Sequence, residues 1–219
     1  MSQWRNRPGP AVKPRTFIEP SLAIPADVPP AGDDWVHEVK HDGYRMQLCV
    51  RDGRVRLFTR RGFDWTDRYP TVTASAAKLK VASASIDGEL VILEDDGRSN
   101  WDRLHSRVED KIAVLIAFDA MEHDGEDLRR LPLLDRKKRL TKIVRKSHAP
   151  GIQIAEHIEG DAAALFAAAC QLGLEGIVSK KVGAPYRSGR VKWWVKTKNK
   201  AEDRSRSACP VRGASENPR

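Results

Sequence analysis

Three short strand-like runs, separated by two Asp-Gly pairs, constrain the fold of this chain more than any other feature. The runs are rich in β-branched and aromatic residues, and the pairs between them are Asp42-Gly43 and Asp52-Gly53. An Asp-Gly pair between apolar runs is a signal for a β-hairpin, because it suits the tight turn that joins two antiparallel strands. We therefore expect hairpins at both pairs. The three runs are WVHEVK, YRMQLCV and RVRLFT.

The rest of the chain mixes helices and strands without regular alternation. An apolar run at 111–128 predicts a buried strand, and residues 132–144 and 160–173 have patterns typical of helices. Ser99 is expected to cap the start of a further short helix. Mixed elements with hairpins favour an α+β fold in which antiparallel sheets are flanked by helices.

Composition divides the chain into a central domain and two flanking segments. Residues 1–19 form a basic, proline-containing segment, residues 20–199 are expected to form the folded domain, and residues 200–219 have the composition of a disordered polar tail. Three cysteines without close spacing argue against a disulfide framework and against a zinc site. No run approaches the roughly 18 apolar residues of a membrane helix. We expect a cytoplasmic protein that does not enter a membrane.

The charge balance points to an anionic partner. Lys and Arg number 39 against 30 Asp and Glu, which gives a net charge of +9. Such an excess favours nucleic acid or a nucleotide as the partner, although a basic protein without such a partner has the same composition.

Lys40 stands between a strand-like run and a predicted turn. Glu38 precedes it by two residues and Arg45 follows it by five. A single lysine in a strand usually faces water. A lysine becomes a nucleophile only when its amine is neutral, a state that burial and neighbouring cations favour. A turn directly after Lys40 would fold the chain back beside it, so both roles remain open at this point.

The run EVKHDGYR resembles the Lys-x-Asp-Gly signature of covalent nucleotidyltransferases. It is most similar to the adenylation domain of bacterial ATP-dependent DNA ligases of the ligase D type, which act in non-homologous end joining. The likeness extends from about Pro20 to Asn199, with the family's motifs in order. In that family the motif lysine attacks the α-phosphate of ATP, releases pyrophosphate and holds AMP. The resemblance implies this role for Lys40, with ATP as the AMP donor and Mg²⁺ or Mn²⁺ as the metal.

The resemblance also implies which residues bind the nucleotide. Glu38 matches an acidic residue near the adenine, Arg45 an arginine that contacts ribose or phosphate, and Glu89 in DGELV a carboxylate that binds the ribose hydroxyls. Phe118 in FDAM matches the ring that stacks on the purine. A core aromatic is the alternative for Phe118, since aromatic side chains mainly fill cores.

Three further motifs match the phosphate end of the family's site. Glu175 in EGIVSK matches a ligand of the divalent metal, and a solvated helix end is the alternative. Lys196 and Lys198 in KWWVKTKN fall on one strand face, where two ammoniums could grip the α-phosphate and favour the neutral amine of the nucleophile; a basic edge strand is the alternative. Arg60 in FTRRG is expected to contact phosphate or DNA. Arg61 follows it directly, and a strand would point Arg61 to the opposite face.

These matches predict the catalytic domain of an ATP-dependent DNA ligase. Its substrate would be nicked or broken duplex DNA, in repair by end joining, and a Ku-type end-binding protein is a candidate partner. We expect a monomer in the bacterial cytosol and nucleoid. The family's ligases continue into an OB-fold domain, which needs roughly 70 residues, whereas about 20 polar residues follow Lys198 here. Reduced or partner-dependent activity is therefore expected, and whether the chain is naturally short or cut at a domain boundary stays open.

Two other functions remain as alternatives. A non-catalytic module that binds DNA nicks or ends would keep the fold and lose the chemistry. An RNA-joining or capping enzyme would share the lysine chemistry, and a preference for ATP over GTP separates ligation from capping. The complete set of motif residues favours an enzyme, because a binding module has no need of a metal-binding carboxylate that faces a lysine.

Overall fold

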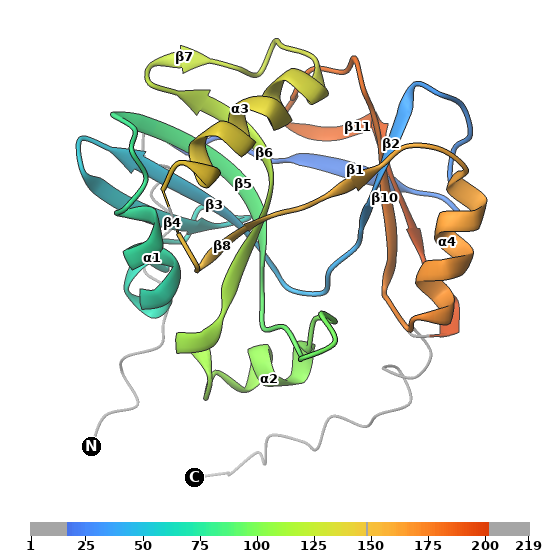
Figure 1. Ribbon diagram of the computed structural model, residues 1–219, viewed down its shortest axis with the longest axis horizontal. Coiled ribbons are helices and arrows are strands. Elements are labelled where there is room, and N and C mark those ends of the chain that lie inside the picture. The colour runs from blue at the N-terminus through green and yellow to red at the C-terminus, as the bar shows by residue number, and fades with distance from the viewer. Residues whose placement is uncertain (1–16, 148, 202–219) are drawn as a thin grey trace, which may run out of the picture.

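The computed structural model describes residues 17–147 and 149–201, which form two β-sheets packed against each other with helices on their outer faces (Figure 1). The sheets are mostly antiparallel, which confirms the predicted α+β class. The expectations for the two flanking segments, 1–19 and 200–219, fall largely outside the described residues.

The first sheet has five strands, and Lys40 directly follows one of them, β2. Its strand order is β1-β11-β10-β2-β9. The pairing of β1 with β11 is parallel and the other pairings are antiparallel. The strands are β1 (Ser21–Pro25), β2 (Trp35–Val39), β9 (His157–Ile158), β10 (Gly176–Lys181) and β11 (Gly189–Lys198).

The second sheet has six strands and lies beside the first (Figure 1). Its strand order is β4-β3-β5-β6-β7, and β8 pairs with β6 in parallel. The strands are β3 (Tyr44–Arg51), β4 (Arg54–Thr59), β5 (Ser83–Val91), β6 (Val114–His123), β7 (Glu126–Asp127) and β8 (Ile152–Ile154).

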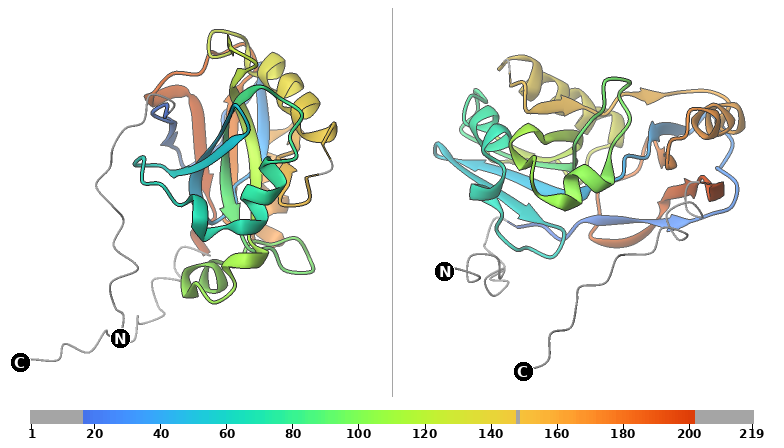
Figure 2. Two further views of the ribbon diagram at one scale, coloured as in Figure 1. Left: turned by 90° about the vertical axis from the view of Figure 1, so that its left-hand side faces the viewer. Right: turned by 90° about the horizontal axis from the view of Figure 1, so that it is seen from below.

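Of the helices in the described part of the chain, α1 and α3 lie against the second sheet and α4 against the first, whereas α2 lies below the strands in Figure 1 (Figures 1 and 2). Helix α4 packs on β10 and β2, whereas α3 packs on β6 and β8. The helices are α1 (Pro70–Ala76), α2 (Trp101–Ser106), α3 (Leu133–Arg145) and α4 (Ala162–Gln171). Within the described ranges, no helix combines the length and the apolar character that crossing a membrane requires.

Of the two predicted hairpins, one is present and the other is not. Asp52-Gly53 joins β3 to β4 with φ values of 50° and 72°, as a type I′ turn requires. Asp42-Gly43 does not form a hairpin, because β2 and β3 belong to different sheets. Gly43 instead allows the backbone after Lys40 to pass close to the backbone of β5, since a Cβ on Gly43 would lie 2.1 Å from the carbonyl oxygen of Leu90. The segment after Lys40 therefore carries the chain from one sheet to the other.

The predicted cap of α2 was wrong by one residue. Asn100 is the N-cap, and its side-chain oxygen accepts from the backbone N–H of Arg103 at 2.9 Å. The hydroxyl of Ser99 accepts a hydrogen bond from the backbone N–H of Asp42 at 3.0 Å. Ser99 thus anchors the segment that crosses between the sheets.

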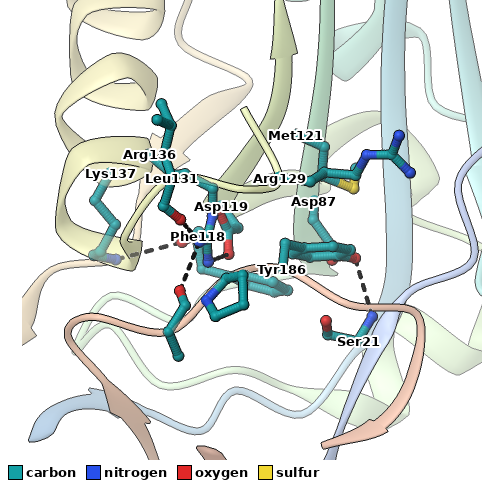
Figure 3. Close-up of polar contacts among 12 residues, drawn as sticks. Ser21, Asp87, Phe118, Asp119, Met121, Arg129, Leu131, Arg136, Lys137 and Tyr186 are labelled. Atoms are coloured by element: carbon teal, nitrogen blue, oxygen red, sulfur yellow. Dashed lines mark hydrogen bonds and ion pairs between the residues drawn. The ribbon is translucent and has the colours of Figure 1, made fainter. Parts of the chain in front are cut away.

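A hydrophobic cluster lies between the sheets, and a buried ion pair anchors an arginine that also reaches the loop between β10 and β11. Phe118 and Met121 of the second sheet pack with Val191 and Trp194 of the first. The ion pair joins α3 to β6 and is shown in Figure 3. It consists of Arg136 and Asp119, both fully buried, and the guanidinium also donates to the carbonyls of Leu131 and Ala184.

Candidate active site

A cleft of about 490 Å³ lies between the two sheets and is lined by charged side chains from both. The five-stranded sheet and the segment after β2 supply one wall, and the six-stranded sheet with the turn after β4 supplies the other. The charged and aromatic lining residues include Glu38, Lys40, His41, Lys180, Trp194, Lys196 and Lys198 on the first wall, and Arg45, Arg60, Glu89 and Phe118 on the second.

Strand register brings Lys40, Glu175 and Lys198 together. The backbone N–H of Lys40 donates to the carbonyl of Gly176 at 2.9 Å, and Gly176 lies opposite Lys198 in the pairing of β10 with β11. Nζ of Lys40 lies 2.5 Å from Oε2 of Glu175, and Nζ of Lys198 lies 3.6 Å from Oε1. The side chain of Lys40 is 20% exposed and that of Glu175 is 9% exposed. The lysine therefore ends inside a charged cluster and not in bulk water.

Lys196 adds a further cation to this cluster. It lies on the same face of β11 as Lys198 and lines the cleft. Burial lowers the pKa of Lys196, and the nearby positive charges of Lys40 and Lys198 lower it further. This part of the cleft therefore has an excess of positive charge that an anionic group would relieve.

Glu89 lies across the cleft, opposite Arg45 in the pairing of β3 with β5. Burial raises the pKa of Glu89 to about 7, although the positive charges of Arg45 and Lys40 act in the opposite direction. A carboxyl group in this state is protonated in a substantial fraction of molecules near neutral pH, and it can then donate as well as accept hydrogen bonds.

Arg45 is held in a fixed orientation by Asp87. Its Nε and Nη2 donate to the two carboxylate oxygens of Asp87 at 2.7 Å each, and Nη2 also donates to the carbonyl of Ser21 at 3.1 Å. The central carbon of the guanidinium lies 4.6 Å from the centre of the Phe118 ring. Sequence reasoning missed Asp87, although it stands two residues before Glu89 in the DGELV motif.

Phe118 belongs both to the cleft and to the core. Its side chain is 9% exposed and lines the cleft. The ring also packs edge-on against the ring of Trp194, with 6.0 Å between the centroids. The two roles considered from the sequence, a nucleotide-facing ring and a core aromatic, are compatible in this position.

Glu38 is buried between two lysines that sequence reasoning did not assign to the site. Its carboxylate oxygens lie 2.7 Å from Nζ of Lys137 and 2.6 Å from Nζ of Lys180. Burial acts to raise the pKa of Glu38, but the two ammoniums bring it below its usual value. Burial lowers the pKa of Lys180 to about 8. Each lysine has a signal in the sequence. Lys180 is the last residue of the EGIVSK motif, and Lys137 lies at helical spacing from the buried Leu133 and Leu140, which predicts that it faces the core.

The remaining predicted residues lie at the mouth of the cleft. Arg60 and Arg61 are exposed and occupy a turn after β4, so the rule of opposite strand faces does not apply to them. Arg60 lines the cleft, and both arginines line a smaller neighbouring hollow. His41, which sequence reasoning did not assign, also lines the cleft, and burial lowers its pKa.

Residues 21–198 match the protein family described as ATP dependent DNA ligase domain. The chain is 38% identical over 185 residues to the multifunctional non-homologous end joining protein LigD of Pseudomonas aeruginosa, an alignment that covers 83% of this chain and 22% of that protein. It is 34% identical over 166 residues to the multifunctional non-homologous end joining DNA repair protein LigD of Mycobacterium tuberculosis, covering 75% of this chain and 22% of that protein. The chain thus spans about a fifth of the length of these curated relatives, 22% in each case.

Solved structures give the same likeness. A mycobacterial DNA ligase D in complex with ATP and MES superimposes with a TM-score of 0.72 at 33% identity, over 82% of this chain and 59% of that one. The DNA ligase-adenylate of Chlorella virus superimposes with a TM-score of 0.58 at 17% identity, over 83% of this chain and 69% of that one, which is a likeness of fold alone.

Proposed function

Since this chain belongs to the ATP-dependent DNA ligase family, we propose that it carries the nucleotidyl-transfer chemistry of a ligase, with Lys40 as the residue that becomes linked to AMP. AMP then passes to a DNA 5′-phosphate, and the nick is sealed. The observation that supports this proposal most directly is the cluster in which Lys40 contacts Glu175 while Lys196 and Lys198 lie beside it.

In the first step, Nζ of Lys40 forms a bond to the α-phosphorus of ATP, and the bond from that phosphorus to the bridging oxygen breaks. Pyrophosphate leaves with the electron pair. The lysine releases two protons in all: Oε2 of Glu175, 2.5 Å from Nζ, is placed to take the first, and the second passes to the departing pyrophosphate or to water. Negative charge grows on the α-phosphate oxygens during attack, and Lys196 and Lys198 supply fixed positive charge for it.

Residues of both walls would bind the nucleoside. Glu38, kept ionised by two buried lysines, can accept from the exocyclic amine of adenine. Phe118 offers a ring for stacking, and Arg45 lies close to that ring, where it can reach ribose or phosphate. Glu89 can hydrogen-bond the ribose hydroxyls. Because Glu38 lies on the first sheet and Phe118, Arg45 and Glu89 lie on the second, the distance between the sheets sets how the nucleoside and its α-phosphate are placed.

A divalent metal fits the carboxylate at the catalytic end. Within residues 17–147 and 149–201, no group of three or more His, Cys, Asp and Glu side chains is arranged to hold a metal by itself. Mg²⁺ commonly uses one or two carboxylates together with substrate phosphates, so Glu175 beside a bound triphosphate suits it, and Mn²⁺ has similar preferences. When bound, the metal would neutralise phosphate charge.

Nicked or broken duplex DNA is the substrate we propose for the later steps. The exposed Arg60 and Arg61 at the cleft mouth can contact its phosphates. We propose that the domain acts as a monomer in bacterial DNA repair, with a Ku-type end-binding protein as a partner. Reaction with ATP is expected to be slow or partner-dependent when no OB-fold domain is present to help orient pyrophosphate.

A gel-based sealing assay with two substrates tests this function. A plain nick is incubated with ATP and Mg²⁺, and a pre-adenylated nick is incubated without ATP. A ligase domain seals the pre-adenylated nick, and a complete ligase seals both. Salt-sensitive DNA binding that Lys40→Ala leaves unchanged, together with no sealing of either substrate, would instead identify a non-catalytic binding module.

A further inference from the structure

The loop between β10 and β11 is fixed to the rest of the domain at several points (Figure 3). Nη1 of Arg136 donates to the carbonyl of Ala184 at 2.8 Å, and the backbone N–H of Tyr186 donates to the carbonyl of Arg129 at 2.8 Å. The indole N–H of Trp193 donates to the carbonyl of Pro185 at 3.0 Å. A loop of seven residues held at these points has little freedom to shift, so Tyr186 is presented to its neighbours in a defined position.

The side chain of Tyr186 points into the space between the sheets. It is 3% exposed, and its ring packs edge-on against the ring of Trp194. The hydroxyl donates to Oδ2 of Asp87 at 2.5 Å and accepts from the backbone N–H of Ser21 at 3.1 Å. Burial raises the pKa of Tyr186, so the hydroxyl keeps its proton and remains a donor. Tyr186 is not among the residues that line the cleft.

A continuous chain of contacts leads from this hydroxyl to the cleft. Asp87 is 1% exposed and binds the guanidinium of Arg45 through both oxygens at 2.7 Å. Arg45 lies against the Phe118 ring and lines the cleft. The third hydrogen bond, from Tyr186, limits rotation of the Asp87 carboxylate, because turning it would break a short bond in a buried place.

We propose that Tyr186 is a positioning residue for nucleotide binding, which acts by fixing the Asp87 carboxylate so that Arg45 is held beside Phe118 at the nucleoside end of the cleft. The inference rests on the proposed function of the cleft. A buried tyrosine that only stabilises the fold would share its burial and its hydrogen bonds, so the test must separate orientation of Arg45 from stability.

Tyr186→Phe removes one hydroxyl and keeps the ring, and Tyr69→Phe is the matched control. The hydroxyl of Tyr69 is also buried but has no hydrogen-bond partner among the described residues. Calorimetric titration with ATP should show affinity about tenfold weaker for Tyr186→Phe, since a hydrogen bond to a charged group has a free energy near that of a tenfold change in binding. Tyr69→Phe should bind ATP as the unmodified protein does.

A double-mutant cycle with Arg45→Lys separates the two roles, because a tyrosine that only stabilises the fold would not show coupling to Arg45 in ATP affinity. If Tyr186 acts through the Arg45 guanidinium, Tyr186→Phe weakens ATP binding little or not at all in the Arg45→Lys background. The Nε–H signal of Arg45 in a ¹⁵N NMR spectrum should also shift in Tyr186→Phe and stay in place in Tyr69→Phe. Losses of affinity that simply add, or a lower thermal midpoint with unchanged ATP affinity, would overturn the proposal.

Failure of this inference can be told from failure of the proposed function. A protein that binds ATP but neither becomes linked to AMP nor seals a pre-adenylated nick contradicts the proposed chemistry, and the double-mutant cycle then still tests the role of Tyr186. An unmodified chain that binds no ATP contradicts both.

Discussion

At the scale of single residues, the cleft collects charges that a core built for stability alone would avoid. Lys40 shares the Glu175 carboxylate with Lys198, and burial brings the pKa of Glu89 to about 7 and that of Lys180 to about 8. Perturbed titrating groups gathered in a cleft are typical of functional sites. They also make the stability of the fold depend on pH and on the oppositely charged side chains that these groups contact.

Glu89→Gln should stabilise the protein at pH 8 and have little effect at pH 4. Its usual pKa is 4.5 and its folded-state pKa is about 7, so between these values the folded protein keeps a proton that the unfolded chain has lost. The free energy of unfolding therefore falls as pH rises from 4.5 to about 7. The glutamine side chain does not ionise, so Glu89→Gln does not undergo this fall. Calorimetry should show a thermal midpoint roughly 7–14 °C higher at pH 8.

The exposed Glu159 supplies the matched control for this pH dependence, as Glu159→Gln. An equal shift of the thermal midpoint at pH 4 and pH 8 for Glu89→Gln would contradict the burial of an uncompensated carboxyl group.

Lys137→Met should destabilise the fold strongly, because it removes one of the two ammoniums that contact the buried Glu38. Breaking a buried ion pair typically costs about 3–5 kcal/mol. Urea unfolding should show that the double variant Glu38→Gln/Lys137→Met recovers part of this loss. Additive losses in the double variant would rule out the coupling.

The sequence predicted much of this site but little of what supports it. Lys40, Glu175 and Lys198 were predicted from their motifs to meet, and register brings them within ion-pair distance. Lys137 and Asp87 were missed because their partners are set by the packing of α3 and by the pairing of β3 with β5. A motif identifies residues that face a ligand, and it does not show which buried groups hold them.

At the scale of elements, local signals predicted strands better than they predicted strand partners. The Asp52-Gly53 hairpin is present because β3 and β4 are neighbours in one sheet. Asp42-Gly43 carries the same local signal, but tertiary packing places β2 and β3 in different sheets. Four short strands were not predicted as separate strands, since each has at most five residues and lacks a clear alternation; they are β1, β7, β8 and β9.

Gly43→Ala should be far more damaging than Gly53→Ala. A Cβ at Gly43 would overlap the carbonyl oxygen of Leu90, which is main chain and cannot rotate away, so we expect a loss above about 3 kcal/mol or failure to fold. At Gly53 a Cβ meets nothing within 4 Å, and only the φ of +72° opposes it, at a cost of about 1–2 kcal/mol. Equal midpoints in urea unfolding would contradict a close approach at Gly43.

At the scale of the whole molecule, neither sheet holds the site alone. The first sheet carries the lysines that would bind phosphate, and the second carries Arg45, Glu89 and Phe118. The cluster around Trp194 and the hydrogen bond from Arg136 to the carbonyl of Ala184 link the two halves. The net charge of +9 favours an anionic partner for the molecule as a whole.

DNA binding should weaken as the salt concentration rises. Arginines at the cleft mouth should contribute to the slope of the logarithm of the binding constant against the logarithm of the salt concentration. Arg60 and Arg190 are exposed and line the cleft. If each contacts one phosphate, Arg60→Ala and Arg190→Ala should each reduce the slope of log K against log[salt] by about 0.9. Arg145→Ala, on an exposed position of α3 away from the lining, is the control. An unchanged slope in both cleft variants would place the DNA elsewhere.

The most direct test of the account is transfer of label from α-³²P-ATP to the protein, with the modified residue mapped by peptide mass spectrometry. We expect Mg²⁺-dependent label on Lys40 that added pyrophosphate reverses, and no label on a folded Lys40→Arg variant. Label that persists in Lys40→Arg, or a folded unmodified protein that takes up no label at any pH and also fails to seal a pre-adenylated nick, would contradict it.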